Sequence, residues 1–441
     1  MSTPRPAPAL LGLLCAAALG LAGCRGGADV PPPEETPTPG VPAAPAPGGT
    51  EPGAPPAPNG SDSTGELRDL MLSSLTATAT SAQMDRALEA LDVEAFRLDV
   101  ADREVWFALS TGSGVWELPE AGHVAGIYEH RADGSWVEIA RLVLESAPTV
   151  ASAEVVPVPV QGGLPIWIAV SGTTGAHSGT FDLLRWDGTH LTSDLWWFSP
   201  SPGAAQITDL DGDGTPEIVL NASDPYVFCY ACGVVDYSEV VYRWVDGEPT
   251  LIDIGAIDGE TEIAALTAHV ARLVEADLWS RAQATIESAL AIAPTNEVVA
   301  WDYRLVRRIA SERLGQAGSP QQPLLTYVLA GEYAQAAALM AALPPEQVFD
   351  RAGPLIEGTQ AVGWEEAMGL YLIDYATRAL AMDASLHEAH AVRALGHVLA
   401  KPDAWADALI DMDAAIEAQP GNAFYQAAVV YLLGQTGGVR G

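Results

Sequence analysis

The hydrophobic pattern of the chain changes near Gly259. Between about Glu94 and Ile254, short β-branched and aromatic runs such as Ile166–Val170 alternate with Gly, Asp and Ser, a pattern typical of strands and turns. After Gly259, alanine and leucine recur with a period of about 3.6 residues, which is typical of amphipathic helices. The change predicts a multidomain fold in which an all-β region precedes an all-α region.

Asp-Gly pairs divide the β region into similar units. They stand at Asp133, Asp187 and Asp246, and Asp-Gly supports the positive φ angles of tight hairpins. The interval of roughly 55 residues suits a four-stranded unit. Three such units are too few for an ordinary closed propeller, so we expect a partial propeller-like or sandwich-like packing. A short helix is expected before them, within residues 66–95.

An aromatic residue three positions before an alanine marks several units of the helical region. These pairs are Trp279/Ala282, Tyr333/Ala336 and Trp405/Ala408, and prolines at Pro294 and Pro420 close two units. The pattern resembles tetratricopeptide repeats, with uneven spacing and insertions such as residues 313–323. The resemblance implies a scaffold whose concave face binds a protein or peptide. A generic helical bundle is the alternative.

The N-terminus has the features of a targeting segment. Arg5 precedes the apolar run Ala9–Ala22, which ends in Leu21-Ala22-Gly23-Cys24. This tetrapeptide resembles the lipobox of bacterial lipoproteins, which implies cleavage before Cys24 and lipidation of that cysteine. An ordinary secretory peptide is the alternative. The resemblance predicts an exported protein, lipid-anchored to the bacterial cell membrane or outer surface.

Composition divides the chain into four predicted segments. They are a signal peptide (1–23), a disordered tether rich in Pro, Gly and Ala (24–65), a short helix with the β domain (66–258), and the helical domain (259–441). With 21 Lys and Arg against 57 Asp and Glu, the formal net charge is -36. This charge disfavours nucleic acid and anionic lipid faces as partners, and it suits divalent cations and basic partners.

An acidic loop lies in the segment ITDLDGDGTPEIVL. Asp209, Asp211 and Asp213 stand at every second position, and Gly212 and Gly214 free the backbone between and after them. Aspartates at every second position of a tight loop point inward together and supply the oxygens that Ca²⁺ prefers. An EF-hand would need a Glu where Leu220 stands and a helix where Ile218–Leu220 is strand-like. A metal-free acidic turn is the other alternative.

The strand–loop–strand setting of these aspartates resembles the calcium loop of FG-GAP repeats, the integrin-type β-propeller units. The resemblance implies a structural Ca²⁺ site. Its ligands would be Asp209, Asp211, Asp213, the carbonyl of Thr215, and Glu217.

Two cysteines, Cys229 and Cys232, follow the acidic loop. In an exported protein they suit a disulfide that pins a turn. A zinc site would need two further ligands, and a redox pair would sit at a helix N-terminus after a parallel strand. The strand-like flanks favour the disulfide.

A second candidate site lies on one predicted helix. His390 and His397 share a face, with Arg393 close to it. In a tetratricopeptide unit this side of the helix would line a groove, where the three side chains could contact an anionic ligand group. The alternative is a set of solvated helix positions, and a metal site is less favoured because no carboxylate is forced into the cluster.

Common catalytic motifs are missing from the sequence, including Gly-x-Ser-x-Gly, His-Glu-x-x-His and the phosphate-binding and dinucleotide fingerprints. The sequence therefore favours an envelope-anchored binding or scaffolding protein whose partner is a protein, a peptide or an envelope glycan. The rival hypothesis is a glycan-acting envelope hydrolase with an unrecognised carboxylate site in the β domain.

Overall fold

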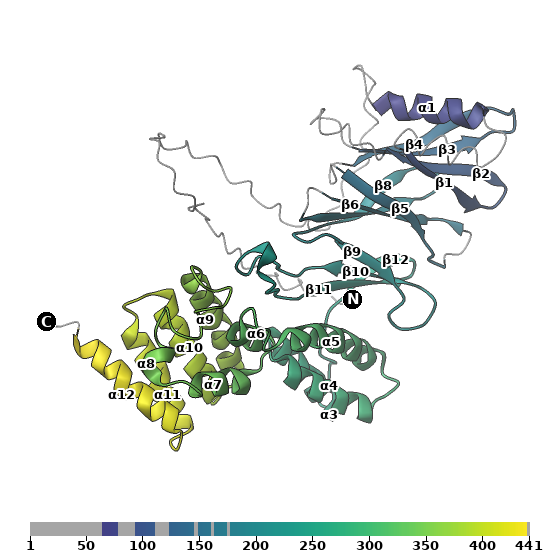
Figure 1. The fold of residues 1–441 in the computed structure, drawn as a ribbon. Coiled ribbons are helices and arrows are strands. Elements are labelled where there is room, and N and C mark those ends of the chain that lie inside the picture. Colours follow the sequence, from purple (N-terminus) through teal and green to yellow (C-terminus); the bar gives the residue numbers. More distant parts are fainter. Residues whose placement is uncertain are drawn as a thin grey trace, which may run out of the picture. The chain divides into compact units, whose positions relative to one another are not determined.

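The computed structural model describes residues 64–77, 93–110, 123–144, 149–159, 163–173 and 177–438. All of them belong to one compact unit, Ser61–Gly441. The signal peptide, Cys24 and the tether lie outside the described residues. Figure 1 shows the order of the elements, in which strands are followed by helices.

The β region consists of three antiparallel sheets, each built from four consecutive strands. The first contains β1 (Val93–Val100), β2 (Arg103–Ser110), β3 (His123–His130) and β4 (Trp136–Leu144). The second contains β5 (Thr149–Val156), β6 (Ile166–Thr173), β7 (Gly179–Trp186) and β8 (Leu191–Ser199). The third contains β9 (Ala205–Thr208), β10 (Glu217–Asn221), β11 (Glu239–Val245) and β12 (Glu248–Ile252). The predicted four-stranded units are confirmed.

Asp-Gly pairs form the predicted hairpin turns. Gly134 joins β3 to β4 with φ 84°, and Gly188 joins β7 to β8 with φ 102°. Between β11 and β12, both Asp246 (φ 54°) and Gly247 (φ 83°) have positive φ. A two-residue hairpin that follows the twist of its strands requires this conformation at both central positions.

Neighbouring sheets share apolar layers. Phe107 and Ile127 of the first sheet and Ile168 and Trp186 of the second belong to one buried cluster. The other face of the second sheet contributes Trp167, Phe181 and Leu183 to a cluster with Ile218 and Leu220 of β10. The central strands β6 and β7 are therefore covered on both faces, which explains their near-continuous hydrophobic sequences.

Helices cover the two outer faces of this set of sheets. Helix α1 (Thr64–Ala77) inserts Met71 and Leu75 against the first sheet, where they contact Trp106 and Tyr128. Leu305 of α5 packs with Val219 and Val241 of the third sheet. Three sheets thus suffice without propeller closure, because a helix replaces the missing neighbour at each end.

The helical region begins with α3 (Glu262–Glu275), α4 (Trp279–Ile292) and α5 (Glu297–Gln316). It continues with α6 (Pro323–Leu329), α7 (Tyr333–Ala341) and α8 (Pro345–Val348). Helices α9 (Glu365–Met382), α10 (His387–Ala400), α11 (Trp405–Ala418) and α12 (Ala423–Gly438) complete it. The predicted order of an all-β region and then an all-α region is confirmed.

Two predicted boundaries differ from the structure. The early helix was expected within residues 66–95, but Glu94 and Ala95 belong to β1, where they pair with Leu109 and Ala108. Residues 78–92 lie outside the described part. The insertion expected from Arg313 onward begins later, because α5 continues to Gln316. Burial of Arg313 among ionic partners keeps the last turn of this helix in place.

Small residues allow close packing between helices. Ala282, Ala336 and Ala408, the alanines that follow an aromatic residue in the repeated pattern, are fully buried. At Gly369 of α9, an added Cβ would lie 2.6 Å from the carbonyl oxygen of Gly396 in α10, so a larger side chain would force the two helices apart. Gly369 and Gly396 thus allow α9 and α10 to approach closely.

Candidate metal centre

Aspartate side chains hold the conformation of the loop between β9 and β10 through hydrogen bonds to its backbone. The Asp209 carboxylate accepts hydrogen bonds from the backbone N–H groups of Gly212 (2.7 Å) and Gly214 (3.0 Å). Asp211 accepts from Asp213 N–H at 3.0 Å, and Asp213 from Thr215 N–H at 2.7 Å. Gly212 (φ 82°) and Gly214 (φ 91°) supply the left-handed backbone that this winding needs.

Three carboxylates of the loop converge. One oxygen each from Asp209, Asp211 and Glu217 lie within 4.8 Å of one another. Glu217, at the start of β10, is only 3 % exposed and accepts a hydrogen bond from Leu210 N–H at 2.7 Å. The structure therefore brings together three of the five predicted ligands. Asp213 and Thr215 lie on the same loop but outside this group.

The converging charges disfavour ionisation of Glu217. Burial, together with the charges of Asp211, Asp213 and Asp209, raises the pKa of its carboxyl to about 7, although the hydrogen bond from Leu210 N–H opposes the rise. A bound cation would remove this repulsion. The donor set consists of oxygens alone, which fits a hard cation such as Ca²⁺ or Mg²⁺ better than zinc or copper.

A cavity of about 820 Å³ lies beside the loop. Asp211, Asp213 and Glu217 line one part of it, and Arg243 and Glu297 line another. Indole rings of Trp244 and Trp301 also face it. A cation held by the loop would lie in the wall of this cavity, where a ligand could reach it.

The structure joins Cys229 and Cys232 in a disulfide. The bond lies in the segment 222–238 that connects β10 to β11, at a short 3-10 helix (Tyr230–Cys232). Val227, Phe228 and Val234 of this segment are buried in the main core of the helical region. The disulfide thus closes a turn inside a segment that joins the two regions.

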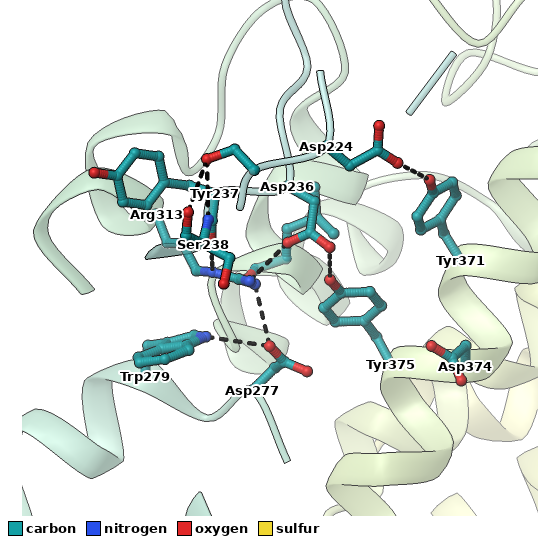
Figure 2. Close-up of polar contacts among 12 residues, drawn as sticks. Asp224, Asp236, Tyr237, Ser238, Asp277, Trp279, Arg313, Tyr371, Asp374 and Tyr375 are labelled. Carbon is teal, nitrogen blue, oxygen red and sulfur yellow. Dashed lines mark hydrogen bonds and ion pairs between the residues drawn. The ribbon is translucent and has the colours of Figure 1, made fainter. Parts of the chain in front are cut away.

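A buried ionic network fixes this segment to the helices (Figure 2). Arg313 of α5, 6 % exposed, contacts Asp236 at 2.7 Å and Asp277 at 3.2 Å. Tyr375 of α9 donates a hydrogen bond to Asp236, and Arg378 pairs with Asp277. Burial raises the pKa of Asp277, and Arg313 and Arg378 oppose that rise.

Sequence reasoning missed this network. Its members are far apart in the chain, and the alternation of strand and loop residues around Asp236 carries no sign of burial. Asp224 extends the network, because its carboxylate accepts a hydrogen bond from Tyr371 of α9 at 3.2 Å. The network joins regions of the fold; it is not a set of residues exposed to a ligand.

The predicted groove residues His390, Arg393 and His397 meet at Asp411 of α11. Arg393 forms two hydrogen bonds with its carboxylate, at 2.6 and 2.9 Å, and the two imidazoles lie 3.2 and 3.4 Å from it. A carboxylate is therefore present in the cluster, contrary to the sequence-based expectation. Asp411 could have been found, since it shares a helix face with the buried residues Ala408 and Ala415.

His390, Arg393 and His397 each contact Asp411 through at least one nitrogen. Hydrogen bonds from Arg393 and His397 hold the pKa of Asp411 near 2 although burial alone would raise it. The cluster therefore stabilises the packing of α10 on α11, and its role in a ligand groove stays a prediction.

Searches of protein families, of curated proteins and of solved structures each found no match to this chain. Among the described helices, none is long and apolar enough to cross a membrane.

Proposed function

We propose that the protein is a non-catalytic binding or scaffolding lipoprotein of the bacterial envelope, with a structural Ca²⁺ in the loop 209–217. The convergence of Asp209, Asp211 and Glu217 carries this proposal. Cys24 would hold the lipid, and the Pro-rich segment after it would act as a tether.

Calcium suits the loop for two reasons. Its ligand shell accepts six to eight oxygens in flexible geometry, and Asp213 with the Thr215 carbonyl can complete a shell begun by the three converging carboxylates. Mg²⁺ demands a stricter octahedral arrangement and gives up water reluctantly. The site would be structural, because it closes the turn between two strands.

The helical region is the proposed binding element. Its stacked helices support the tetratricopeptide interpretation, in which a concave face binds a protein or peptide. The net charge of -36 favours a basic partner over an acidic one. An envelope glycan is the other partner class that fits a protein held at the cell surface.

Thermal unfolding with and without Ca²⁺ tests the metal proposal. At a tenfold excess over Kd, binding to the folded state adds about 1.4 kcal/mol to the free energy of unfolding, so Tm should rise. Asp211→Ala should abolish the rise. Asp133→Asn, in a hairpin turn where the carboxylate accepts hydrogen bonds from Ser135, should keep it. A wild-type Tm that does not respond to Ca²⁺ contradicts the site.

A pull-down from solubilised membranes tests the binding role. The partner should be retained by the wild-type protein in Ca²⁺ and lost in part after chelation or with Asp211→Ala. Cys24→Ser should move the protein from the membrane to the soluble fraction. Recovery of the variant in the membrane fraction contradicts the lipid anchor.

The hydrolase remains the second candidate, because one observation favours it. Glu217, with a pKa of about 7, lines a cavity beside Asp211, as an acid and a carboxylate do in glycosidases. Purified protein should be assayed on envelope glycans with Glu217→Gln as the control. Hydrolysis that the variant loses supports the hydrolase, whereas a Ca²⁺-dependent Tm without hydrolysis supports the binding protein.

A further inference from the structure

The cavity beside the acidic loop is lined by two kinds of residue. Its volume of about 820 Å³ lies within the range of roughly 300–1,000 Å³ that is typical of small-molecule sites. Leu164, Trp244 and Val245 contribute apolar surface to it, and the loop contributes the carboxylates of Asp211 and Glu217. A molecule that fills the cavity must therefore offer both apolar surface and hydrogen-bonding groups.

Charge narrows the class of ligand. Among the described residues that line the cavity, Arg243 is the one cationic side chain, and it is already paired with Glu297. The carboxylates of the lining belong to Asp211, Asp213, Glu217, Asp246, Glu248 and Glu297. They would repel an anion, and an organic cation would compete with the metal ion for them. The cavity therefore favours a neutral molecule whose hydroxyl groups donate hydrogen bonds to carboxylate oxygens.

The half-buried Trp244 is fixed in the lining. Its indole N–H donates a hydrogen bond to the Pro216 carbonyl at 2.8 Å. Its ring packs against the buried Trp167, with the centroids 5.1 Å apart. An aromatic ring held in this way offers a rigid apolar surface that loses little conformational entropy when a ligand binds. A sugar ring matches such a surface, because it combines a flat C–H face with a rim of hydroxyl groups.

The proposed Ca²⁺ would leave coordination positions for such a ligand. Ca²⁺ takes six to eight oxygens, and the loop offers five candidate ligand residues, so roughly one to three positions remain. Four of these five residues also line the cavity, namely Asp211, Asp213, Thr215 and Glu217. Two neighbouring hydroxyl groups of a sugar can therefore reach the ion from the cavity.

We propose that this cavity binds a neutral oligosaccharide, with Trp244 packed against a sugar ring and two neighbouring hydroxyl groups completing the coordination of Ca²⁺. The inference rests on the calcium site of the proposed function, and it assigns sugar binding to the β region and α5 instead of the other helices. Binding breaks no bond, so the sugar should be recovered intact, in contrast to the outcome for a hydrolase.

An array of neutral oligosaccharides of mannose, galactose and N-acetylglucosamine tests the proposal. The full chain carries Cys24→Ser in every sample, so that lipid makes no contribution. The wild type should bind saccharides of the array in Ca²⁺ and release them on chelation. Trp244→Ala should weaken this binding by at least about tenfold and keep the rise of Tm in Ca²⁺. Trp196→Ala is the matched control, because Trp196 is 46 % exposed and lies outside the cavity lining.

Val245→Gln provides a second variant in case Trp244→Ala does not fold. Val245 is 38 % exposed, so a neutral polar side chain there should weaken sugar binding and leave the fold unchanged. A wild type that responds to Ca²⁺ in Tm but binds no saccharide of the array overturns the sugar site and leaves the calcium site standing. Sugar binding that survives chelation, or that both variants retain in full, also overturns the proposal. A Tm that does not respond to Ca²⁺ contradicts the calcium site itself.

Discussion

The β region and the helical region differ in how far their outermost apolar surfaces are buried. Helix α1 covers the outer face of the first sheet, and α5 covers that of the third. In the helical region, α12 leaves an apolar stripe exposed. Among the described residues, the outer faces of the sheets are therefore covered by helices, whereas part of the apolar surface of α12 is not.

Breaking the junction between the regions should have the largest effect. Arg313→Ala leaves the buried Asp277 and the half-buried Asp236 with fewer cationic partners. Removal of one partner of a buried ion pair costs about 3–5 kcal/mol, and chemical denaturation should show that loss. Arg307→Ala, on the exposed side of the same helix, should cost less than about 0.5 kcal/mol. Equal effects of the two substitutions would mean that the network contributes nothing.

Removing the cover of the first sheet should have the next largest effect. Met71 is fully buried between α1 and that sheet, so Met71→Ala should cost about 2–5 kcal/mol. Amide hydrogen exchange in β2 and β3 should become faster. Ser73→Ala, on the exposed side of α1, serves as the control. Unchanged exchange would show that α1 rests on the sheet without stabilising it.

The stability of the packing of α5 on the third sheet should depend on pH. Asp302 is 1 % exposed, and its burial raises the pKa of the carboxyl to about 7, with the Gly255 N–H opposing the rise. The folded state therefore binds more protons than the unfolded state between about pH 4 and 7, and stability falls as pH rises through that range.

Asp302→Asn should remove this slope. The difference in unfolding free energy between variant and wild type should shift in favour of the variant by about 1–4 kcal/mol from pH 4 to pH 8. Parallel stability curves of the two proteins would argue against a buried neutral carboxyl.

The smallest effect on stability is expected at the exposed stripe. Val430→Asp changes a side chain that is 71 % exposed, so the unfolding free energy at low protein concentration should change by less than about 0.5 kcal/mol. If this substitution destabilises the monomer as much as Met71→Ala does, then Val430 is not an exposed position and the two regions do not differ in this respect.

Local signals predicted most of the fold. The apolar run Ile166–Val170 predicted a strand that the structure has as β6, and Asp-Gly pairs located the hairpins. Alternating aspartates located the acidic loop, because its hydrogen bonds connect residues two to five positions apart. Each of these features depends on neighbours along the chain.

Contacts between segments far apart in the sequence could not be predicted from such local signals. Arg313 looked like the start of an insertion because nothing near it in sequence supplies Asp236 or Asp277. The order of the sheets and their helical covers depends on which apolar faces meet, and many pairings satisfy the same alternation. Asp411 was overlooked because an aspartate in an acidic helix resembles its solvated neighbours.

The burial of segment 222–238 in the helical core has a consequence for synthesis. Val227, Phe228 and Val234 leave the ribosome well before α9, whose residues Tyr371 and Tyr375 bind the aspartates on either side of them. A chain that lacks α9 would therefore leave this apolar loop incompletely covered, and such a partly folded species is prone to aggregation.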